Sequence, residues 1–155
     1  MKDSQSSAFT PFRQLHHVCV VVRDLEKAMA YYEKLGIGPW YDYPKGVPYV
    51  ELQVQSEAAS KSLRYMCCDL ENFQLQLCQP SDLDSPQKRF LDEHGEGVYH
   101  LGFESDLDRA ESFGRSLGLS VIGRGRRQDN TGFCYFDTRD GAGTVLSVRR
   151  SPGVK

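Results

Sequence analysis

The sequence predicts an α+β fold of two β-α-β-β-β modules, and three observations predict it. Two stretches of the chain repeat one another in the order strand, capped helix and Leu-Gly. Each helix carries its apolar residues on one face, which needs a sheet to cover it. The length of 155 residues leaves room for one ordinary domain or for two small units that share a core. We therefore expect two half-domains in one curved mixed sheet that lines a cleft, with a short helical connector between them.

The repeat also sets the expected boundaries. Residues 1–12 read as a polar N-terminal tail without the apolar core of a secretion signal, and residues 13–150 as a single domain. Within that domain we expect a first module at 13–80, a connector helix at 85–95 and a second module at 96–150. Neither module is long enough to bury a core alone, so we expect them to pack as one unit.

The first copy starts with His17 and an apolar run, Val18–Val22, that fits a buried strand. Asp24 is a good N-cap for the helix that follows, and Gly36 is a good C-terminal stop. Three candidate strands complete the first module: Val47–Gln55, Ser62–Cys68 and Asn72–Cys78.

The second copy repeats this order from His100 and the strand-like run Leu101–Phe103. Asp106 takes the place of the N-cap, and Gly118 takes the place of the stop. The candidate strands of the second module are Ser120–Gly123, Phe133–Phe136 and Thr144–Arg149.

The connector and the turns have their own signals. Ser85 as N-cap, Pro86 at the first helical position and Gly95 as the stop predict a short helix between the copies. Asp69–Asn72 and Asp140–Gly143 are expected to form the hairpin turns before the last strand of each copy.

Alternation along the strands places a set of polar side chains on the face that points away from the helices. The set is His17, Gln74, Gln76, His100, Ser147 and Arg149. In a flat sheet this face would be exposed, whereas a pair of curved sheets turns it into the lining of a cavity. The sequence therefore predicts a polar cavity to which both copies contribute.

Two histidines at equivalent places in the repeat suggest a metal site. His17, His100 and the neighbouring Gln76 are the side chains that a divalent metal built across a two-fold axis would use. The alternative is that each histidine is a hydrogen-bonded core residue. His16 and His94 have no histidine at the matching place in the other copy, and we expect both to be ordinary surface residues.

Several motifs together resemble a known superfamily. They are Leu15–Leu25, Tyr31–Tyr32, Leu35–Gly36, Leu75–Pro80 and Asp84–His100, the last with a Ser-Pro helix, Gly-Glu-Gly and an aromatic-His pair. These motifs resemble the vicinal oxygen chelate superfamily of glyoxalase, bleomycin-resistance and dioxygenase proteins. Within it, the chain is most similar to the methylmalonyl-CoA epimerase branch of glyoxalase-like proteins. The resemblance covers nearly everything from about residue 13 to residue 150.

The resemblance implies a glyoxalase-like fold around one divalent metal ion, which could be Zn, Mn, Co, Ni or Fe. Carried over by position, the ligands fall on His17, Gln76 and His100. The fourth ligand, a Glu in the family, falls on Ser147, which makes this residue the main departure from the family. Serine is a poor divalent ligand and cannot act as a carboxylate base, so the departure weakens both the metal shell and the usual proton chemistry.

Further residues are candidates for contact with a substrate. Glu51 is the candidate catalytic base, with an exposed strand carboxylate as the alternative. Arg126, in a basic loop, and Arg149 are candidates to bind a phosphate or carboxylate, although such a loop is more often simply solvated. Gln74 and Ser147 are expected to bind substrate from the cavity face.

Three functions remain open at this point. The leading one is a divalent-metal-dependent isomerase, epimerase or lyase that acts through an enolate-like intermediate on a small oxygenated substrate, with an acyl-CoA thioester as one candidate. The second is a binding protein that sequesters a small molecule in the same cleft without a metal. The third is a ring-cleaving dioxygenase, which the missing carboxylate disfavours because that chemistry uses two His and a carboxylate around Fe(II).

Composition narrows the partners. A net charge of -2 gives no broad positive field for nucleic acid, and no apolar run approaches the length of a membrane span. The five cysteines are odd in number and contain no Cys-x-x-Cys pair, so we expect buried free thiols in a cytoplasmic protein. We expect a small-molecule substrate, no nucleic acid, no membrane and a homodimer.

Overall fold

The computed structural model describes residues 8–44 and 47–153. The elements in chain order are β1 (Gln14–Val21), α1 (Leu25–Lys34), β2 (Tyr41–Asp42), β3 (Tyr49–Gln53), α2 (Glu57–Ser62), β4 (Arg64–Asp69), β5 (Gln74–Gln79), α3 (Pro86–His94), β6 (Gly97–Glu104), α4 (Leu107–Ser116), β7 (Val121–Arg127), β8 (Gly132–Phe136), α5 (Arg139–Ala142) and β9 (Val145–Arg150). Each half begins with a strand and a helix and continues with further strands, and α3 joins the halves. The predicted α+β class is confirmed.

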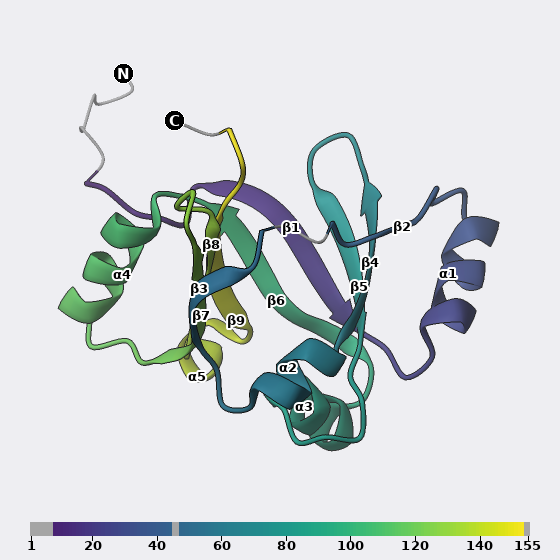
Figure 1. Cartoon of the computed structure of the whole chain (residues 1–155). Coiled ribbons are helices and arrows are strands. Elements are labelled where there is room, and N and C mark those ends of the chain that lie inside the picture. The colour runs from purple at the N-terminus through teal and green to yellow at the C-terminus, as the bar shows by residue number, and fades with distance from the viewer. Residues whose placement is uncertain (1–7, 45–46, 154–155) are drawn as a thin grey trace.

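One mixed sheet of nine strands runs through the described residues, in the order β2-β4-β5-β1-β6-β9-β8-β7-β3. The strands that begin the two copies, β1 and β6, lie antiparallel at its centre. Each has the last strand of its own copy as a parallel neighbour, β5 beside β1 and β9 beside β6. Figure 1 shows α1 and α4 at opposite ends of the molecule with β1 and β6 between them. The two halves are therefore related by an approximate two-fold axis that passes between β1 and β6.

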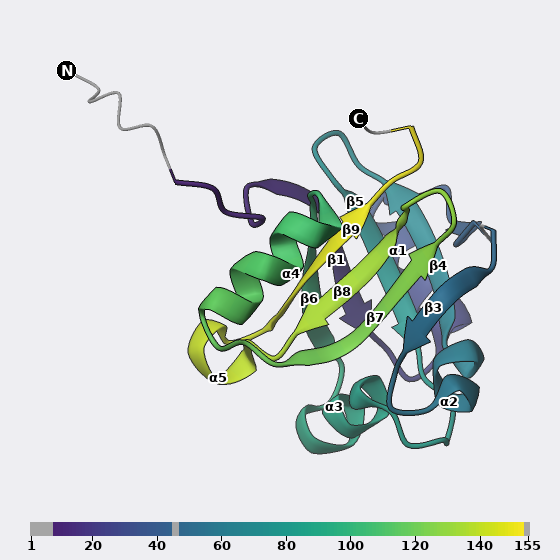
Figure 2. The ribbon, with the colours of Figure 1, turned by 60° about the vertical axis from the view of Figure 1, so that its left-hand side comes forward.

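Strand β3 leaves its own half of the molecule. The sequence predicts a strand over Val47–Gln55 in the first module, whereas β3 pairs with β7 of the second half, as Figure 2 shows. As a result β2 and β3 lie at opposite ends of the sheet order. Asp42 and Tyr49 are separated by few residues, and at roughly 3.5 Å per residue this segment spans at most about 25 Å. The sheet must therefore curl until its two edges approach one another.

The capping residues that the sequence predicts begin the helices. Asp24 accepts a hydrogen bond from the Lys27 backbone N–H at the start of α1, and Asp106 accepts one from the Arg109 N–H at the start of α4. The connector helix α3 begins after Ser85 with Pro86 in its first turn. It ends at Gly95, whose φ of 81° is favourable only for glycine.

Several local features differ from the prediction. The sequence predicts neither the short strand β2 nor helix α2, which is capped by Ser56 and includes Ser62, the expected first residue of a strand. The turn expected at Asp140–Gly143 is part of the short helix α5. Part of the segment that the sequence predicts as a polar tail packs against the domain, because Phe9 and Phe12 both contact the ring of Phe113 on α4. Aromatic side chains near a chain end gain by covering an apolar helix face.

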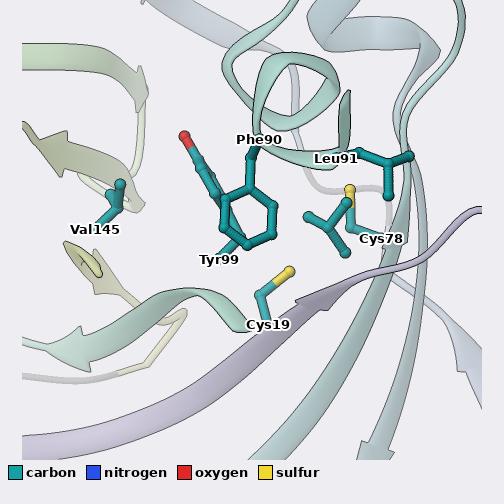
Figure 3. Close-up of a cluster of buried hydrophobic side chains, with 7 residues drawn as sticks. Cys19, Cys78, Phe90, Leu91, Tyr99 and Val145 are labelled. Carbon is teal, nitrogen blue, oxygen red and sulfur yellow. The ribbon is translucent and has the colours of Figure 1, made fainter. Parts of the chain in front are cut away.

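The core consists of three clusters, each of which joins one of the longer helices to the sheet. The cluster at α1 contains Val22, Leu25 and Leu77, and the cluster at α4 contains Leu107, Ala110, Cys134, Phe136 and Val148. The cluster at α3 contains Cys19, Val21, Cys78, Phe90, Leu91, Tyr99 and Val145, most of which are labelled in Figure 3. All five cysteines are buried and free, as expected. Among the described helices, none combines the length and the apolarity that crossing a membrane requires.

Candidate functional site

A cavity of about 420 Å³ lies against the inner face of the curled sheet. Its polar lining includes four of the residues that the sequence places on this face, namely His17, Gln76, Ser147 and Arg149. Its aromatic lining comes from Tyr43, Tyr49, Tyr65, Tyr99, Phe133 and Tyr135. Both halves of the chain thus contribute to one pocket of the size that usually holds a small molecule.

The two histidines of the repeat contact one another, and of the two His17 lines the cavity while His100 lies behind it. The Nε2 atoms of His17 and His100 lie 2.8 Å apart, within hydrogen-bond distance, and their rings are nearly perpendicular at 88°. The exposed fraction is 6% for His17 and 1% for His100. The pairing of β1 with β6 therefore places both imidazoles in one buried spot.

A glycine makes room for this arrangement. In the pairing of β1 with β6, His17 lies opposite Gly102. A Cβ atom at Gly102 would collide with the His17 ring, with Cε1 and Nε2 as the nearest atoms. Sequence patterns gave no reason to single out this residue, because the need for glycine arises only when the two strands meet.

His16 is not the ordinary surface residue that the sequence suggests. Its Nδ1 lies 2.9 Å from the Nδ1 of His17, and its side chain is about half buried. The register of β1 against β6 shifts between Leu15 and His17, which leaves His16 outside the regular pairing. A register shift of this kind breaks strict alternation, so neighbouring side chains can approach the same site.

Burial keeps these imidazoles neutral. It lowers the pKa of His100 to about 3 and the pKa of His17 well below its usual value, with His100 and His16 adding to the effect on His17. The pKa of His16 is also lowered, first by burial and then by the charge of Arg149. The Nδ1 atom of His100 is buried and has no hydrogen-bond partner among the described residues. At neutral pH the site therefore offers nitrogen lone pairs rather than positive charges.

A chain of hydrogen bonds orients Gln76. Its Nε2 donates to Gln74 Oε1 at 2.7 Å, and Gln74 Nε2 in turn donates to Tyr41 Oη at 2.9 Å and Asp69 Oδ1 at 3.2 Å. Gln74, which was expected to contact substrate, is not among the residues that line the cavity. Gln74 instead lies behind Gln76 and accepts a hydrogen bond from its amide NH₂ group. The amide oxygen of Gln76 takes no part in these hydrogen bonds and can bind a ligand.

Ser147 occupies the place in the second half that Gln76 occupies in the first. Gln76 pairs with Cys19, two residues after His17, and Ser147 pairs with Gly102, two residues after His100. Ser147 is 2% exposed, and its Oγ lies 3.4 Å from the Leu101 carbonyl oxygen, to which it donates a weak hydrogen bond. The second half thus supplies a hydroxyl where the first supplies an amide.

Two further predicted site residues, Glu51 and Arg126, do not line the cavity. Glu51 is exposed and forms an ion pair with Arg124 at 3.0 Å, so the structure does not support it as a base at this site. Arg126 forms ion pairs with Asp108 at 2.9 Å and with Glu111 at 3.2 Å, both on α4. Alternation along β7 directs Arg124 and Arg126 toward the helix layer, which is why neither lines the cavity.

The predicted Arg149 does line the cavity, and Arg127 joins it. Arg149 Nε lies 3.8 Å from Glu104 Oε2, and it is buried without a hydrogen-bond partner. Arg127 donates to the Val47 carbonyl oxygen at 2.7 Å and to Tyr49 Oη at 2.9 Å, which ties β3 to β7 beside the cavity. The sequence predicts a basic loop over Arg124–Arg127, whereas these residues form the end of strand β7, and alternation along this strand distinguishes Arg127 from Arg124 and Arg126.

Tyrosines on the walls add hydrogen-bond donors that the sequence did not identify. Burial raises the pKa of Tyr99 and of Tyr135, so both stay protonated at neutral pH. Tyr135 lies edge-on to His100, with ring centroids 5.0 Å apart. The polar part of the cavity lining that includes His17, Gln76 and Ser147 is called the floor below. A ligand on this floor would therefore meet phenol groups that can donate hydrogen bonds to its oxygens.

The donors on the floor fit a divalent metal in part. The Nε2 atoms of His17 and His100 lie 2.8 Å apart, so both nitrogens could bind one ion after a small movement. With Gln76 they make three neutral donors. No cluster of three His, Cys, Asp or Glu side chains that could hold a metal occurs among the described residues, and Ser147 adds no charge. The residues present fit an ion that keeps further positions for a ligand or water.

Several solved structures have a similar fold. The structure is similar to the crystal structure of methylmalonyl-CoA epimerase from Mycobacterium tuberculosis, with 24% identity, a TM-score of 0.67, and coverage of 94% of this chain and 93% of that chain. It is also similar to a variant of Streptomyces coelicolor methylmalonyl-CoA epimerase in complex with 2-nitronate-propionyl-CoA, with 21% identity, a TM-score of 0.65, and coverage of 94% and 99%. A hypothetical protein from Bacillus halodurans matches with 15% identity, a TM-score of 0.63, and coverage of 91% and 96%. These likenesses establish the fold.

A search of curated proteins finds no match to the sequence. A family model, however, matches residues 16–136, which is most of the chain. The chain therefore belongs to the Glyoxalase/Bleomycin resistance protein/Dioxygenase superfamily.

Proposed function

We propose that the protein is an enzyme that exchanges a proton between solvent water and the carbon beside the carbonyl group of a small oxygenated acid, as an epimerase or isomerase does. The observation that carries this proposal is that His17 and Gln76 line an aromatic cavity and that His17 contacts the buried His100. The similar folds named as methylmalonyl-CoA epimerases support the same reaction class and suggest an acyl-CoA thioester as substrate.

The same proposal includes a divalent metal ion held by His17, His100 and Gln76. When bound, such an ion supplies Lewis-acid polarisation of neighbouring substrate oxygens. The chain's own residues prepare its site. His16 contacts the far nitrogen of His17, and Gln74 fixes the amide of Gln76, as partners of metal ligands commonly do.

Other cavity residues bind and orient the substrate. Arg149 is placed to bind a carboxylate near the imidazoles, and the phenol of Tyr135 is placed to donate to a substrate oxygen. The aromatic walls exclude water from the floor, which strengthens each of these polar contacts. At about 420 Å³ the cavity accommodates the acyl part of a thioester rather than a whole CoA molecule.

A specific observation favours a second candidate function, the sequestration of a small molecule without chemistry. Asp84 is the carboxylate among the described lining residues, and it forms an ion pair with Arg89 at 2.9 Å. With Glu51 outside the cavity and serine at position 147, the described floor has no carboxylate to accept a proton. A binding protein needs no such group.

Hydrogen exchange separates the two functions. The protein, supplied with Co²⁺, is incubated in D₂O with methylmalonyl-CoA, propionyl-CoA and simple 2-oxo acids, and deuterium at the carbon beside the carbonyl is followed by NMR. Proton-transfer chemistry predicts incorporation that His100→Ala reduces at least about a hundredfold and the exposed His94→Ala leaves unchanged. Saturable binding of a compound that gains no deuterium would favour the binding protein instead.

A further inference from the structure

The cavity is rich in positive charge. The charged side chains among its described lining residues are Lys61, Asp84, Arg127, Arg149 and Arg150. Asp84 is engaged by Arg89, and Arg149 is the basic residue closest in register to Ser147, two positions along β9. The floor is therefore made of neutral donors with a guanidinium beside them.

A divalent ion bound at His17, His100 and Gln76 would add positive charge to a cavity that is already positively charged. The ion would bring two positive charges to a buried place whose described lining has Asp84, paired with Arg89, as its carboxylate, while the nearby Glu104 is paired with Arg149. Burying charge without a counter-charge is strongly unfavourable. Arg149 lines the same cavity as His17, and its contact with Glu104 is long at 3.8 Å, so its positive charge adds to that cost. An anion that enters with the ion removes both problems.

On this basis, and resting on the metal site in the proposed function, we propose that the cavity takes up a divalent ion only together with a carboxylate-bearing ligand. The ligand's carboxylate supplies the negative charge that Ser147 does not, and it is held by Arg149. Binding of the ion and binding of the acid are then thermodynamically coupled, so each strengthens the other.

The contacts of Arg149 suit it to this role. Its Nε is buried and lacks a hydrogen-bond partner among the described residues, so it has donor capacity for an incoming acid. Its ion-pair partner Glu104 is already engaged, because Glu104 accepts hydrogen bonds from the backbone N–H and the hydroxyl of Ser151, both at 2.6 Å. At 3.8 Å the Arg149–Glu104 contact is long for a hydrogen bond.

The test measures the coupling between a probe metal and a probe acid. Co²⁺ binding is followed by the visible absorption of the bound ion, with and without malonate, at matched concentrations of free Co²⁺. The proposal predicts that malonate tightens Co²⁺ binding at least about tenfold, and that Co²⁺ tightens malonate binding by the same factor. Co²⁺ binding that is equally tight with and without malonate would overturn this inference while leaving the metal site of the proposed function standing.

Two matched variants separate charge from shape. Ser147→Glu supplies the missing negative charge, so it should bind Co²⁺ without malonate at least about tenfold more tightly than the wild type and lose the coupling. Ser147→Gln has nearly the same size without the charge, and it should keep the coupling. A gain of equal size in both variants would contradict the charge argument.

A third variant keeps the test decisive if a larger side chain at position 147 prevents folding. Arg149→Gln removes the guanidinium and leaves the three donors in place, so the coupling should fall below about threefold. Undiminished coupling in Arg149→Gln would contradict the role of this residue. Malonate binding with no Co²⁺ binding under any condition would overturn both this inference and the metal in the proposed function, and would favour the sequestration protein.

Discussion

The two halves of the molecule share a backbone plan and differ in the chemistry they bring to it. His17 and His100 take matching places on the central strands, and the last strand of each half lies parallel beside them. Around that frame the first half supplies the hydrogen-bonded pair Gln74 and Gln76, whereas the second supplies Val145 and Ser147 at the same register positions. The symmetry of the strands thus brings two imidazoles together. The asymmetry of their neighbours determines which other polar groups the site contains.

The neighbours of the two imidazoles differ in the same way. His17 has a polar partner in His16, and its ring occupies the space that the absent side chain of Gly102 leaves. His100 lies opposite Cys19, is packed by Tyr99 and Tyr135, and has an unpartnered Nδ1. Apart from their contact with each other, His17 is therefore held by a polar contact and His100 by aromatic packing.

The largest effect is expected from Gly102→Ala. The new methyl group would occupy the space of the His17 ring, so the ring must move and separate from His100. We expect a loss of about 3 kcal/mol in the free energy of unfolding, measured by urea denaturation, together with loss of Co²⁺ binding. As a control, Gly141→Ala places its methyl group in open space and should leave both properties unchanged.

A smaller effect is expected from the contacts that fix each helix to the sheet. In the second half, Glu111 on α4 is mostly buried and pairs with Arg124 at 2.9 Å and with Arg126 at 3.2 Å. Glu111→Gln leaves these guanidinium groups underpaired and should cost about 2 kcal/mol in the free energy of unfolding. In the first half, the Glu26–Arg64 pair is exposed, so Glu26→Gln should cost nothing measurable. Equal losses in the two variants would contradict this difference between the halves.

A third prediction concerns a thiol in the second half. Burial raises the pKa of Cys134 to about 12, above its value in the unfolded chain. Between about pH 9 and pH 12 the unfolded chain has lost this proton and the folded chain keeps it, so stability is full below pH 9 and falls as the pH rises. Relative to Cys134→Ala, the wild type should lose about 1.4 kcal/mol more for each pH unit within this range, measured by urea denaturation. Parallel pH profiles would show that Cys134 is not protected as described.

The smallest effect is expected from Glu51→Gln. Glu51 lies on the edge strand β3, exposed and paired with Arg124, and does not line the cavity. We expect a change of less than about 0.5 kcal/mol in stability and deuterium exchange within about twofold of the wild type. A large loss of exchange with unchanged Co²⁺ binding would return Glu51 to the site as a base.

Much of the fold could be predicted because it follows from local chemistry. Asp24, Asp106 and Ser85 begin helices for reasons that their own side chains determine, and alternation places His17, Gln76 and His100 on one face. The crossover of β3, the register shift at His16 and the need for glycine at position 102 could not be predicted. Each depends on how two distant strands meet, which periodicity within a single strand does not report.

The candidate site was predictable to the same extent. His17, Gln76, His100, Ser147 and Arg149 were placed on the correct face by alternation and by the internal repeat. Glu51 was misplaced because alternation on the edge strand β3 does not say which face is the inner one until its partner is known, and Arg126 was misplaced because its segment was expected to be a loop and is part of strand β7. Tyr135 and Arg127 were missed as individual residues because an aromatic or a basic residue in a strand carries no signal of its own.

The central claim is that each half supplies one imidazole to a single shared site. The most direct test is the amount of metal bound per chain after dialysis against Co²⁺ and malonate, for the wild type, His17→Ala, His100→Ala and the exposed control His94→Ala. The account predicts about one equivalent for the wild type and for His94→Ala, and less than about a tenth for each of the other two. Retention of the full equivalent in either His17→Ala or His100→Ala would contradict a shared site.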